Sequence, residues 1–142
     1  MKTVSDILAK KGTDILSISP SVTVIDAVKA MAQQKVGALL VLETGKLRGI
    51  VSEQDYTRKV ILTCLNAEQL LVQDIMTQQV VVTRPDQPIQ EVMAIMTERR
   101  IRHLPVMHNG ELVGLVSIGD LVKEIISDQQ FIIAQLEHYI QG

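Results

Sequence analysis

Cysteine and histidine are scarce in this chain, and their positions exclude several kinds of chemistry. The single cysteine, Cys64, rules out an internal disulfide and a thiolate metal cluster, and we expect it to be a small buried apolar side chain. The histidines His103, His108 and His138 form no i, i+4 metal-binding pair, and no nucleophile-elbow, dinucleotide-binding or Walker sequence occurs. We therefore predict no metal site and no catalytic activity.

An excess of one charge and long apolar runs are also missing. The net charge of -2 provides no basic surface for nucleic acid. The longest apolar runs have the length of strands and are broken by polar residues, which argues against a membrane span or a signal peptide. With 142 residues and 46% apolar content, the chain can bury a substantial core as one domain made of two halves. We expect a soluble, cytoplasmic protein.

What the chain does contain is one unit that occurs twice. Residues 20–61 align with residues 85–126 without a gap, at a constant offset of 65. Eleven aligned positions are identical, where average residue usage gives roughly two or three. The identical pairs are Pro20/Pro85, Met31/Met96, Leu39/Leu104, Val41/Val106, Gly45/Gly110, Leu47/Leu112, Gly49/Gly114, Val51/Val116, Ser52/Ser117, Asp55/Asp120 and Ile61/Ile126.

Each repeat predicts the order β-α-β-β-α, because a helical apolar periodicity is followed by two strand-length apolar runs and a second helix. Between the two runs, residues 43–46 and 108–111 place a glycine at the same position and predict turns. Asn109-Gly110 is the stronger signal for a tight hairpin, because both residues tolerate positive φ. In the first repeat, the predicted elements are strand 15–19, a helix with its apolar face on Val24, Ala27, Val28 and Met31, strands 38–42 and 47–51 and helix 54–62. In the second repeat, they are a helix with its apolar face on Ile89, Val92, Met93 and Met96, strands 104–107 and 112–116 and helix 119–127.

Outside the repeats, the chain is less regular. Residues 4–8 resemble residues 72–76, but the first copy lies three residues further from its repeat, which indicates an insertion near 10–13. Residues 63–71 predict a turn or short helix, and an apolar stripe near the end predicts a terminal helix that packs on its own domain or on a second copy. We place the domains at 1–66 (first repeat with its N-terminal segment), 67–127 (second repeat) and 128–142 (C-terminal amphipathic helix).

One local motif is preserved in both repeats: a serine where a strand meets a helix, followed three residues later by an aspartate. Ser52 with Asp55 and Ser117 with Asp120 can act simply as helix caps. The same groups suit a nucleotide, because a helix start with a serine hydroxyl binds phosphate and a carboxylate accepts both ribose hydroxyls. The glycine three residues before each serine, Gly49 or Gly114, predicts close approach of a flat base to the backbone.

The G-h-h-S-x-x-D ending resembles paired CBS domains, as do the tandem β-α-β-β-α order, Asp74-Ile75-Met76-Thr77 and Ile101-Arg102-His103-Leu104-Pro105-Val106. The chain is most similar to small stand-alone CBS-pair proteins. The resemblance implies an α/β (α+β) fold with two repeats packed about a pseudo-twofold axis, N- and C-terminal helical segments, and two clefts for adenosine-containing ligands. It also implies a disc-like homodimer.

The resemblance also implies roles for individual residues at matching positions. Asp55 and Asp120 match the ribose-binding aspartate, and Ser52 and Ser117 match the hydroxyl near the phosphate. Arg102 and His103, after Ile101, match basic residues that face phosphate, whereas the first repeat has Gly37 and Ala38 there. Thr83, two residues before Pro85, is a further candidate, although its hydroxyl can equally close the turn. Arg58 and Lys59 could reach a phosphate.

Two functions remain open on the sequence. The first is a regulatory module that binds AMP, ADP, ATP or NAD(H) as a ligand and senses energy or redox state, with the cleft containing Asp120 as the better site. The second is a protein–protein adaptor in which the serine and aspartate are only helix caps. A sensor without an attached enzyme must report to a protein target, which the sequence does not name.

Overall fold

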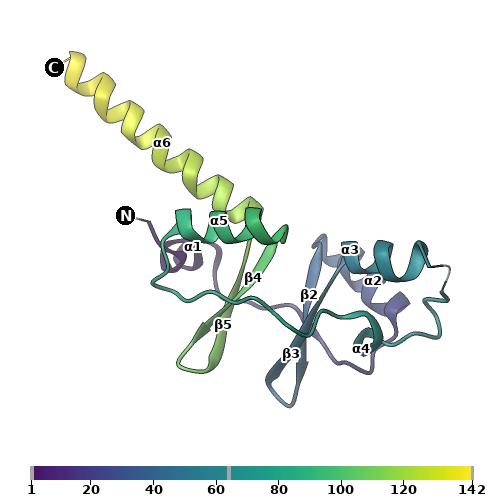
Figure 1. Ribbon diagram of the computed structural model, residues 1–142. Helices are drawn as coiled ribbons and strands as arrows, with labels where there is room; N and C mark the ends of the chain where they lie inside the picture. The colour runs from purple at the N-terminus through teal and green to yellow at the C-terminus, as the bar shows by residue number, and fades with distance from the viewer. Residues whose placement is uncertain (1, 64, 142) are drawn as a thin grey trace. The chain divides into compact units, whose positions relative to one another are not determined.

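The computed structural model describes residues 2–63 and 65–141, so the expectation for Cys64 lies outside the described residues. The chain divides into two compact units. Unit 1 combines Met1–Thr13 with Val82–Gly142, and unit 2 is Asp14–Val81. Each unit therefore holds one repeat, but unit 1 is built from two separate stretches of chain (Figure 1).

Unit 2 is a three-stranded sheet with helical segments. Strand β1 is parallel to β2, and β2 is antiparallel to β3. The unit holds β1 (Ser17–Ile18), α2 (Val24–Gln34), β2 (Ala38–Glu43), β3 (Lys46–Ser52), α3 (Glu53–Tyr56), the π-helix η1 (Thr57–Ile61) and α4 (Val72–Ile75). Helix α4 packs against α2. The order predicted for the first repeat is thus confirmed.

Unit 1 has a two-stranded antiparallel sheet, extended by an isolated parallel bridge between Thr83 and Val106 where the second repeat would have its first strand. The unit holds α1 (Val4–Lys11), α5 (Ile89–Arg99), β4 (His103–His108), β5 (Glu111–Ser117) and α6 (Ile118–Gln141). Helix α1 contacts both β5 and α6.

The two hairpins have the predicted turns. Thr44 and Gly45 join β2 to β3 with φ of 49° and 79°, and Asn109 and Gly110 join β4 to β5 with φ of 52° and 78°. Two successive residues with positive φ match the twist of antiparallel strands. The register in each hairpin shifts at the same place, after Val41 and after Val106.

Four apolar positions that are identical in the two repeats lie in the core of each unit. The apolar identities Met31/Met96, Leu39/Leu104, Val41/Val106 and Val51/Val116 are all at most 2% exposed. These positions are alike because both units bury the same helix against the same hairpin.

Three elements differ from the sequence prediction. The strand expected over 15–19 is reduced to Ser17–Ile18, and the helix expected over 54–62 begins at Glu53 and changes from α to π geometry at Thr57. Helix α6 runs without a break from Ile118 to Gln141, so the terminal apolar stripe continues the helix that follows Ser117. Residues 67–69 form the expected turn.

The short helices α1 and α4 lie in exchanged positions. Helix α1 precedes the first repeat in sequence but packs in unit 1 with the second repeat, whereas α4 follows the first repeat and packs on it. Backbone hydrogen bonds hold both: Val4 N–H donates to Gln87 O at 3.0 Å, and Val72 N–H donates to Val22 O at 2.8 Å. The boundaries 1–66, 67–127 and 128–142 follow sequence order, whereas the compact units do not.

Candidate functional site

In both units, the serine and aspartate motif lies at the start of a helix. The Ser117 N–H donates to Oδ2 of Asp120 at 2.8 Å, and the Asp120 N–H donates to Ser117 Oγ at 3.2 Å. In unit 2, the Ser52 N–H donates to Oδ2 of Asp55 at 2.9 Å and the Asp55 N–H donates to Ser52 Oγ at 3.2 Å. Both pairs are reciprocal helix caps. A ligand that binds the aspartate of either motif therefore contacts a carboxylate that also caps a helix.

The remaining contacts of the two aspartates differ. In unit 2, Oδ1 of Asp55 accepts from Thr77 Oγ1 at 3.3 Å and pairs with Lys59 Nζ at 3.3 Å, so both carboxylate oxygens are engaged. For Asp120, the contacts found among residues 2–63 and 65–141 all involve Oδ2. The side chain of Asp120 is also the more exposed of the two, at 18% against 12% for Asp55.

The structure brings the predicted basic residues next to the motif of unit 1. His103 pairs with Ser117 across the hairpin, and the Ile118 N–H donates to the carbonyl of Arg102 at 2.8 Å. Arg102 is exposed and His103 is half-buried. Two positive or polar side chains thus flank the start of α6.

Unit 2 repeats this geometry without basic side chains. Ala38 pairs with Ser52, and the Glu53 N–H donates to the carbonyl of Gly37 at 3.0 Å. Gly37 and Ala38 add no donor beyond the backbone. The two motifs therefore have the same backbone and different electrostatic surroundings.

Thr83 lies beside β4 but uses its hydroxyl locally. Its side chain is buried, its backbone pairs with Pro105 and Met107, and its hydroxyl donates to the Gln87 side chain. The turn that contains Pro85 is thus closed by Thr83, while a ligand role for this residue stays a prediction. Ile101 is half-buried directly before Arg102, and its N–H donates to Met96 O at 3.0 Å at the end of α5.

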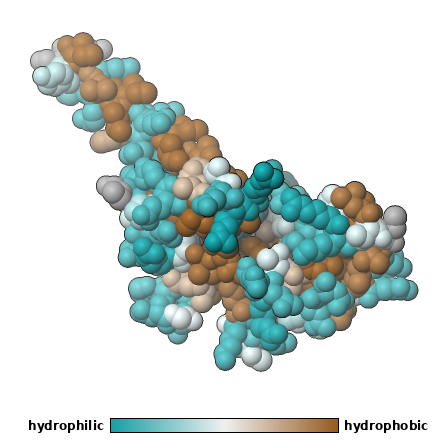
Figure 2. Space-filling view, in the orientation of Figure 1, coloured by the Kyte–Doolittle hydropathy of each residue, from teal (hydrophilic) through white to brown (hydrophobic). Residues whose placement is uncertain are grey.

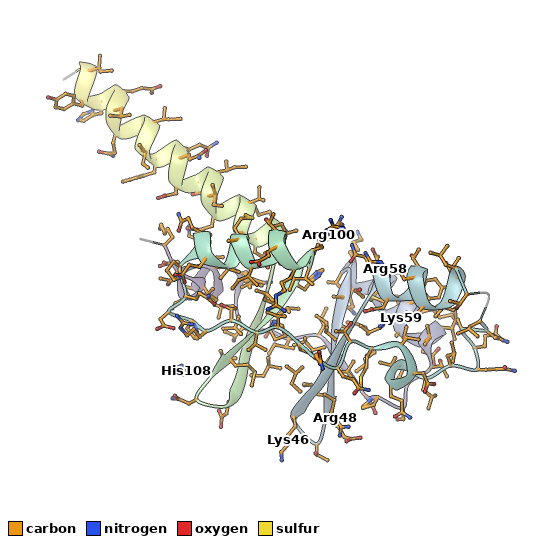
Figure 3. The ribbon with its side chains drawn as sticks, viewed as in Figure 1. Lys46, Arg48, Arg58, Lys59, Arg100 and His108 are labelled. Atoms are coloured by element: carbon orange, nitrogen blue, oxygen red, sulfur yellow. The ribbon has the colours of Figure 1, made fainter. Side chains whose placement is uncertain are left out.

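The two cations on the helix of unit 2 have different surroundings. Lys59 donates to the carbonyl of Ile75 at 2.8 Å as well as pairing with Asp55, so a phosphate would have to compete with these two partners. Arg58 is exposed and lines a surface hollow of about 270 Å³ with Glu53, Gln54 and Thr57. Figure 3 shows Arg58 and Lys59 on the helical segment that follows Ser52. A phosphate role for Arg58 stays a prediction.

The reason predicted for Gly49 and Gly114 is wrong. A Cβ at Gly49 would lie 2.8 Å from both Met76 Sδ and Thr77 O, and one at Gly114 would lie 2.7 Å from Leu8 Cδ2. The close approach that glycine permits is therefore used by the residues that follow α4 and by Leu8 of α1. The repeat preserves these glycines because each hairpin accepts a short helix on the same face.

Sequence reasoning missed Lys11 and Thr77 as partners of the motif. Lys11 Nζ donates to Asp120 Oδ2 at 2.7 Å and to Leu115 O at 2.9 Å. Both residues lie outside the aligned 42 residues, so a comparison of the repeats passes over them. The sequence signal that could have revealed Lys11 is the three-residue insertion near residues 10–13, which makes α1 longer than α4.

Burial opposes ionisation of Asp120, but the hydrogen bonds from Lys11 and Ser117 outweigh it and hold the pKa of this carboxyl below its ordinary value of 3.8. Because the folded pKa is the lower one, the stabilisation is present above about pH 4 and is lost as the pH falls through the folded pKa. Asp120→Asn is expected to lower the free energy of unfolding by about 1 kcal/mol at pH 7. Urea titrations from pH 7 to pH 3 should show this difference shrinking below pH 4.

The same comparison in a Lys11→Met background tests the cause of the shift. The effect of Asp120→Asn is expected to be smaller there, because the ion pair is already absent. An Asp120→Asn effect that is independent of pH and of Lys11 would contradict this assignment.

The arrangement of two hairpins, each carrying a Ser-x-x-Asp helix start, agrees with a known domain. The sequence model of the CBS domain matches residues 4–61 and 72–127. The chain belongs to the CBS-domain family. CBS-pair proteins are generally regulatory modules, and the two matches cover both repeats together with the short helix that precedes each of them.

Relatives of similar size support this assignment. The CBS domain-containing protein CBSX3, mitochondrial, from Arabidopsis thaliana is 38% identical over 99% of this chain and 72% of its own length. The structure of a CBS-domain protein from Burkholderia ambifaria is 46% identical, with a TM-score of 0.87 over 90% of this chain and 96% of that one. The CBS domain pair of protein MJ0100, solved with 5′-methylthioadenosine and S-adenosyl-L-methionine, shares the fold at 22% identity, with a TM-score of 0.78 over 90% of this chain and 98% of that one.

Residues 2–63 and 65–141 lack two further kinds of feature. None of the helices there is long and apolar enough to cross a membrane. No group of three His, Cys, Asp or Glu side chains in that part of the chain is placed to hold a metal ion.

Proposed function

We propose that this CBS-pair protein is a regulatory module that binds an adenine nucleotide, AMP, ADP, ATP or NAD(H), as a ligand and performs no catalysis on it. The observation that carries the proposal is the start of α6, where Ser117 and Asp120 lie beside Arg102 and His103. A related domain pair binds two adenosine-containing molecules, which supports the ligand class.

The proposed roles follow from the contacts of each side chain. Oδ1 of Asp120 accepts a ribose hydroxyl, since the contacts found for this residue in the described chain involve Oδ2. Ser117, Arg102 and His103 face the phosphate groups, because hydroxyl, guanidinium and imidazole N–H groups are phosphate donors. Ile101 and Thr83 complete the surroundings in unit 1.

Unit 2 is proposed as the weaker site. Ser52 and Asp55 keep the motif, but both oxygens of Asp55 already have partners. Gly37 and Ala38 supply no charge, which leaves Arg58 as the candidate for phosphate. A less charged ligand, or no ligand, suits this unit better.

A regulatory role requires that the ligand bind two states of the protein with different affinity. A protein target recognises the state that the ligand favours.

The proposed compartment is the cytoplasm, although the Arabidopsis relative is described as mitochondrial. Subcellular fractionation of the tagged protein tests the compartment directly.

Calorimetric titration with AMP, ADP, ATP, NAD⁺ and NADH tests the ligand. At least one of them is expected to bind with a dissociation constant below 1 mM, and Asp120→Ala is expected to weaken that binding by at least about thirtyfold, which corresponds to about 2 kcal/mol of lost hydrogen bonding. Asp55→Ala should change the affinity by less than about threefold if unit 1 holds the stronger site.

Asp74→Ala is the matched control for loss of a helix cap. Asp74 caps α4 through a hydrogen bond from the Leu71 N–H at 2.9 Å, and no ligand role is assigned to it. The proposal fails if none of the five nucleotides binds below 1 mM, or if Asp120→Ala binds as tightly as the parent protein.

An adaptor is the alternative function, and the reciprocal caps at Ser52 and Ser117 favour it, because they show that the motif has a structural use without any ligand. Pull-down of a protein target with and without nucleotide separates the two functions. A target that binds equally well to a protein lacking both Asp55 and Asp120 identifies an adaptor.

The protein is further proposed to be a homodimer that pairs through α6. The apolar stripe of this helix continues past the part that packs in unit 1, and its later side chains are exposed (Figure 2). Exposed apolar side chains in the stripe are Val122, Ile126, Phe131, Ile132, Ile133, Leu136, Tyr139 and Ile140.

A further inference from the structure

The carboxylate assigned to the ribose in unit 1 is in contact with a lysine from a distant part of the sequence. Lys11 Nζ lies 2.7 Å from Asp120 Oδ2, and the Lys11 side chain is 35% exposed. Lys11 is the last residue of α1, and its ammonium also donates to the carbonyl of Leu115 on β5 at 2.9 Å. The ammonium group therefore reaches both the helix and the strand that form the Ser117–Asp120 motif.

The placement of Lys11 is specific to unit 1. In unit 2 the cation beside the aspartate comes from the same helix, where Lys59 is four residues after Asp55. The repeat position equivalent to Lys59 is Glu124, which has the opposite charge. Helix α6 thus has no cation at this position, and α1 of the same unit supplies one.

Lys10 holds the end of α1 in place. Its ammonium lies 3.0 Å from both carboxylate oxygens of Glu124, and the side chain of Glu124 is only 6% exposed. Lys2 adds a longer contact of 3.6 Å to the same carboxylate. The insertion that lengthens α1 consequently supplies two lysines in sequence, one that anchors the helix on α6 and one that reaches Asp120.

We propose that Lys11 is the specificity-determining residue of unit 1, and that it favours phosphorylated nucleotides over the uncharged nucleoside. This inference rests on the proposed function. The ammonium of Lys11 lies on Oδ2 of the carboxylate whose Oδ1 is assigned to the ribose, so it stays beside a ligand bound there. An uncharged nucleoside offers that ammonium no new partner, whereas a nucleotide offers a phosphate, which lysine binds as a mobile point charge on a flexible stem.

The experiment compares adenosine with AMP by calorimetric titration at one ionic strength, using the full-length protein and its Lys11→Met variant. The parent is expected to bind AMP more tightly than adenosine. In Lys11→Met, AMP should bind about tenfold more weakly while adenosine binds equally well or more tightly, so the preference for AMP falls by at least about tenfold.

Three variants complete the design. Lys46→Met removes one positive charge from the exposed start of β3 in unit 2 and should leave the preference unchanged. Lys11→Arg keeps the charge and should retain most of the preference. Lys11→Gln provides a second neutral variant if Lys11→Met does not fold, as judged by circular dichroism and thermal unfolding.

The outcomes separate this inference from the proposed function. If Asp120→Ala abolishes nucleotide binding but neither Lys11→Met nor Lys11→Gln changes the preference for AMP, the role of Lys11 is overturned and the nucleotide function stands. If the parent binds no adenine nucleotide, or Asp120→Ala binds as the parent does, both are overturned.

Discussion

Gly49→Ala is expected to lower the free energy of unfolding by about 3 kcal/mol, although it adds only one methyl group. The new Cβ would lie 2.8 Å from the carbonyl oxygen of Thr77 and 2.8 Å from Met76 Sδ. Thr77 cannot move away easily, because its N–H and C=O are both hydrogen-bonded to Ile50, at 2.9 Å and 3.0 Å. Urea unfolding followed by circular dichroism measures the loss.

Gly114→Ala is the matched control, since it occupies the same position in the other repeat. There the nearest atoms are Cδ2 and Cδ1 of Leu8, at 2.7 Å and 3.2 Å, which are the end of a flexible side chain. This variant is expected to lose about 1 kcal/mol. Equal losses for the two variants would contradict the conclusion that the backbone of Thr77 is the limiting contact.

The double variant Ile132→Glu/Leu136→Glu is expected to convert a dimer into a monomer at micromolar concentrations. The two side chains are 50% and 57% exposed and lie one turn apart on α6. Pairing of two such stripes would bury on the order of 1,000 Å² in total, at the lower end of specific interfaces and consistent with a micromolar dissociation constant. Two buried glutamates on each copy should weaken the dimer by at least about a hundredfold.

Charge on α6 favours a second copy as the occupant. After Lys123, the helix has no Lys or Arg through Gln141, so it lacks the cationic face that holds an amphipathic helix on an anionic membrane. Glu137 is the only acidic side chain after Asp128, so two copies meet with little repulsion.

Sedimentation equilibrium measures the association, and Gln130→Glu/Ala134→Glu is the control. It adds the same charge to the same helix, at positions away from the stripe, and should remain a dimer. A parent protein that is still monomeric at about 100 μM would contradict self-association. Binding to anionic vesicles that is lost in the Ile132/Leu136 variant would point to a lipid surface instead.

Much of the local structure could be predicted from the repeat. Asn109-Gly110 and Thr44-Gly45 specify turns with positive φ, and Ser117 and Ser52 mark the starts of helices, because each depends on a few neighbouring residues. The family could be predicted for the same reason, since its motif is local.

Contacts between distant segments could not be predicted in this way. Residues 4–8 and 72–76 have similar sequences, so each fits the same kind of surface, and the pattern does not say which repeat it covers. The roles of Gly49 and Gly114 were misread because the helices that contact them come from elsewhere in the chain. Lys11 escaped notice because its partner Asp120 is 109 residues away.

The exchange of α1 and α4 also determines the order in which the chain can fold during synthesis. Unit 2 is a continuous segment, Asp14–Val81, and can form as soon as that segment has left the ribosome. Helix α1 emerges first but packs on β5 and α6, which are made last. Helix α1 can therefore dock only after β5 and α6 have been made. This docking closes a loop of chain that contains the folded unit 2, and the long sequence separation makes the step slow.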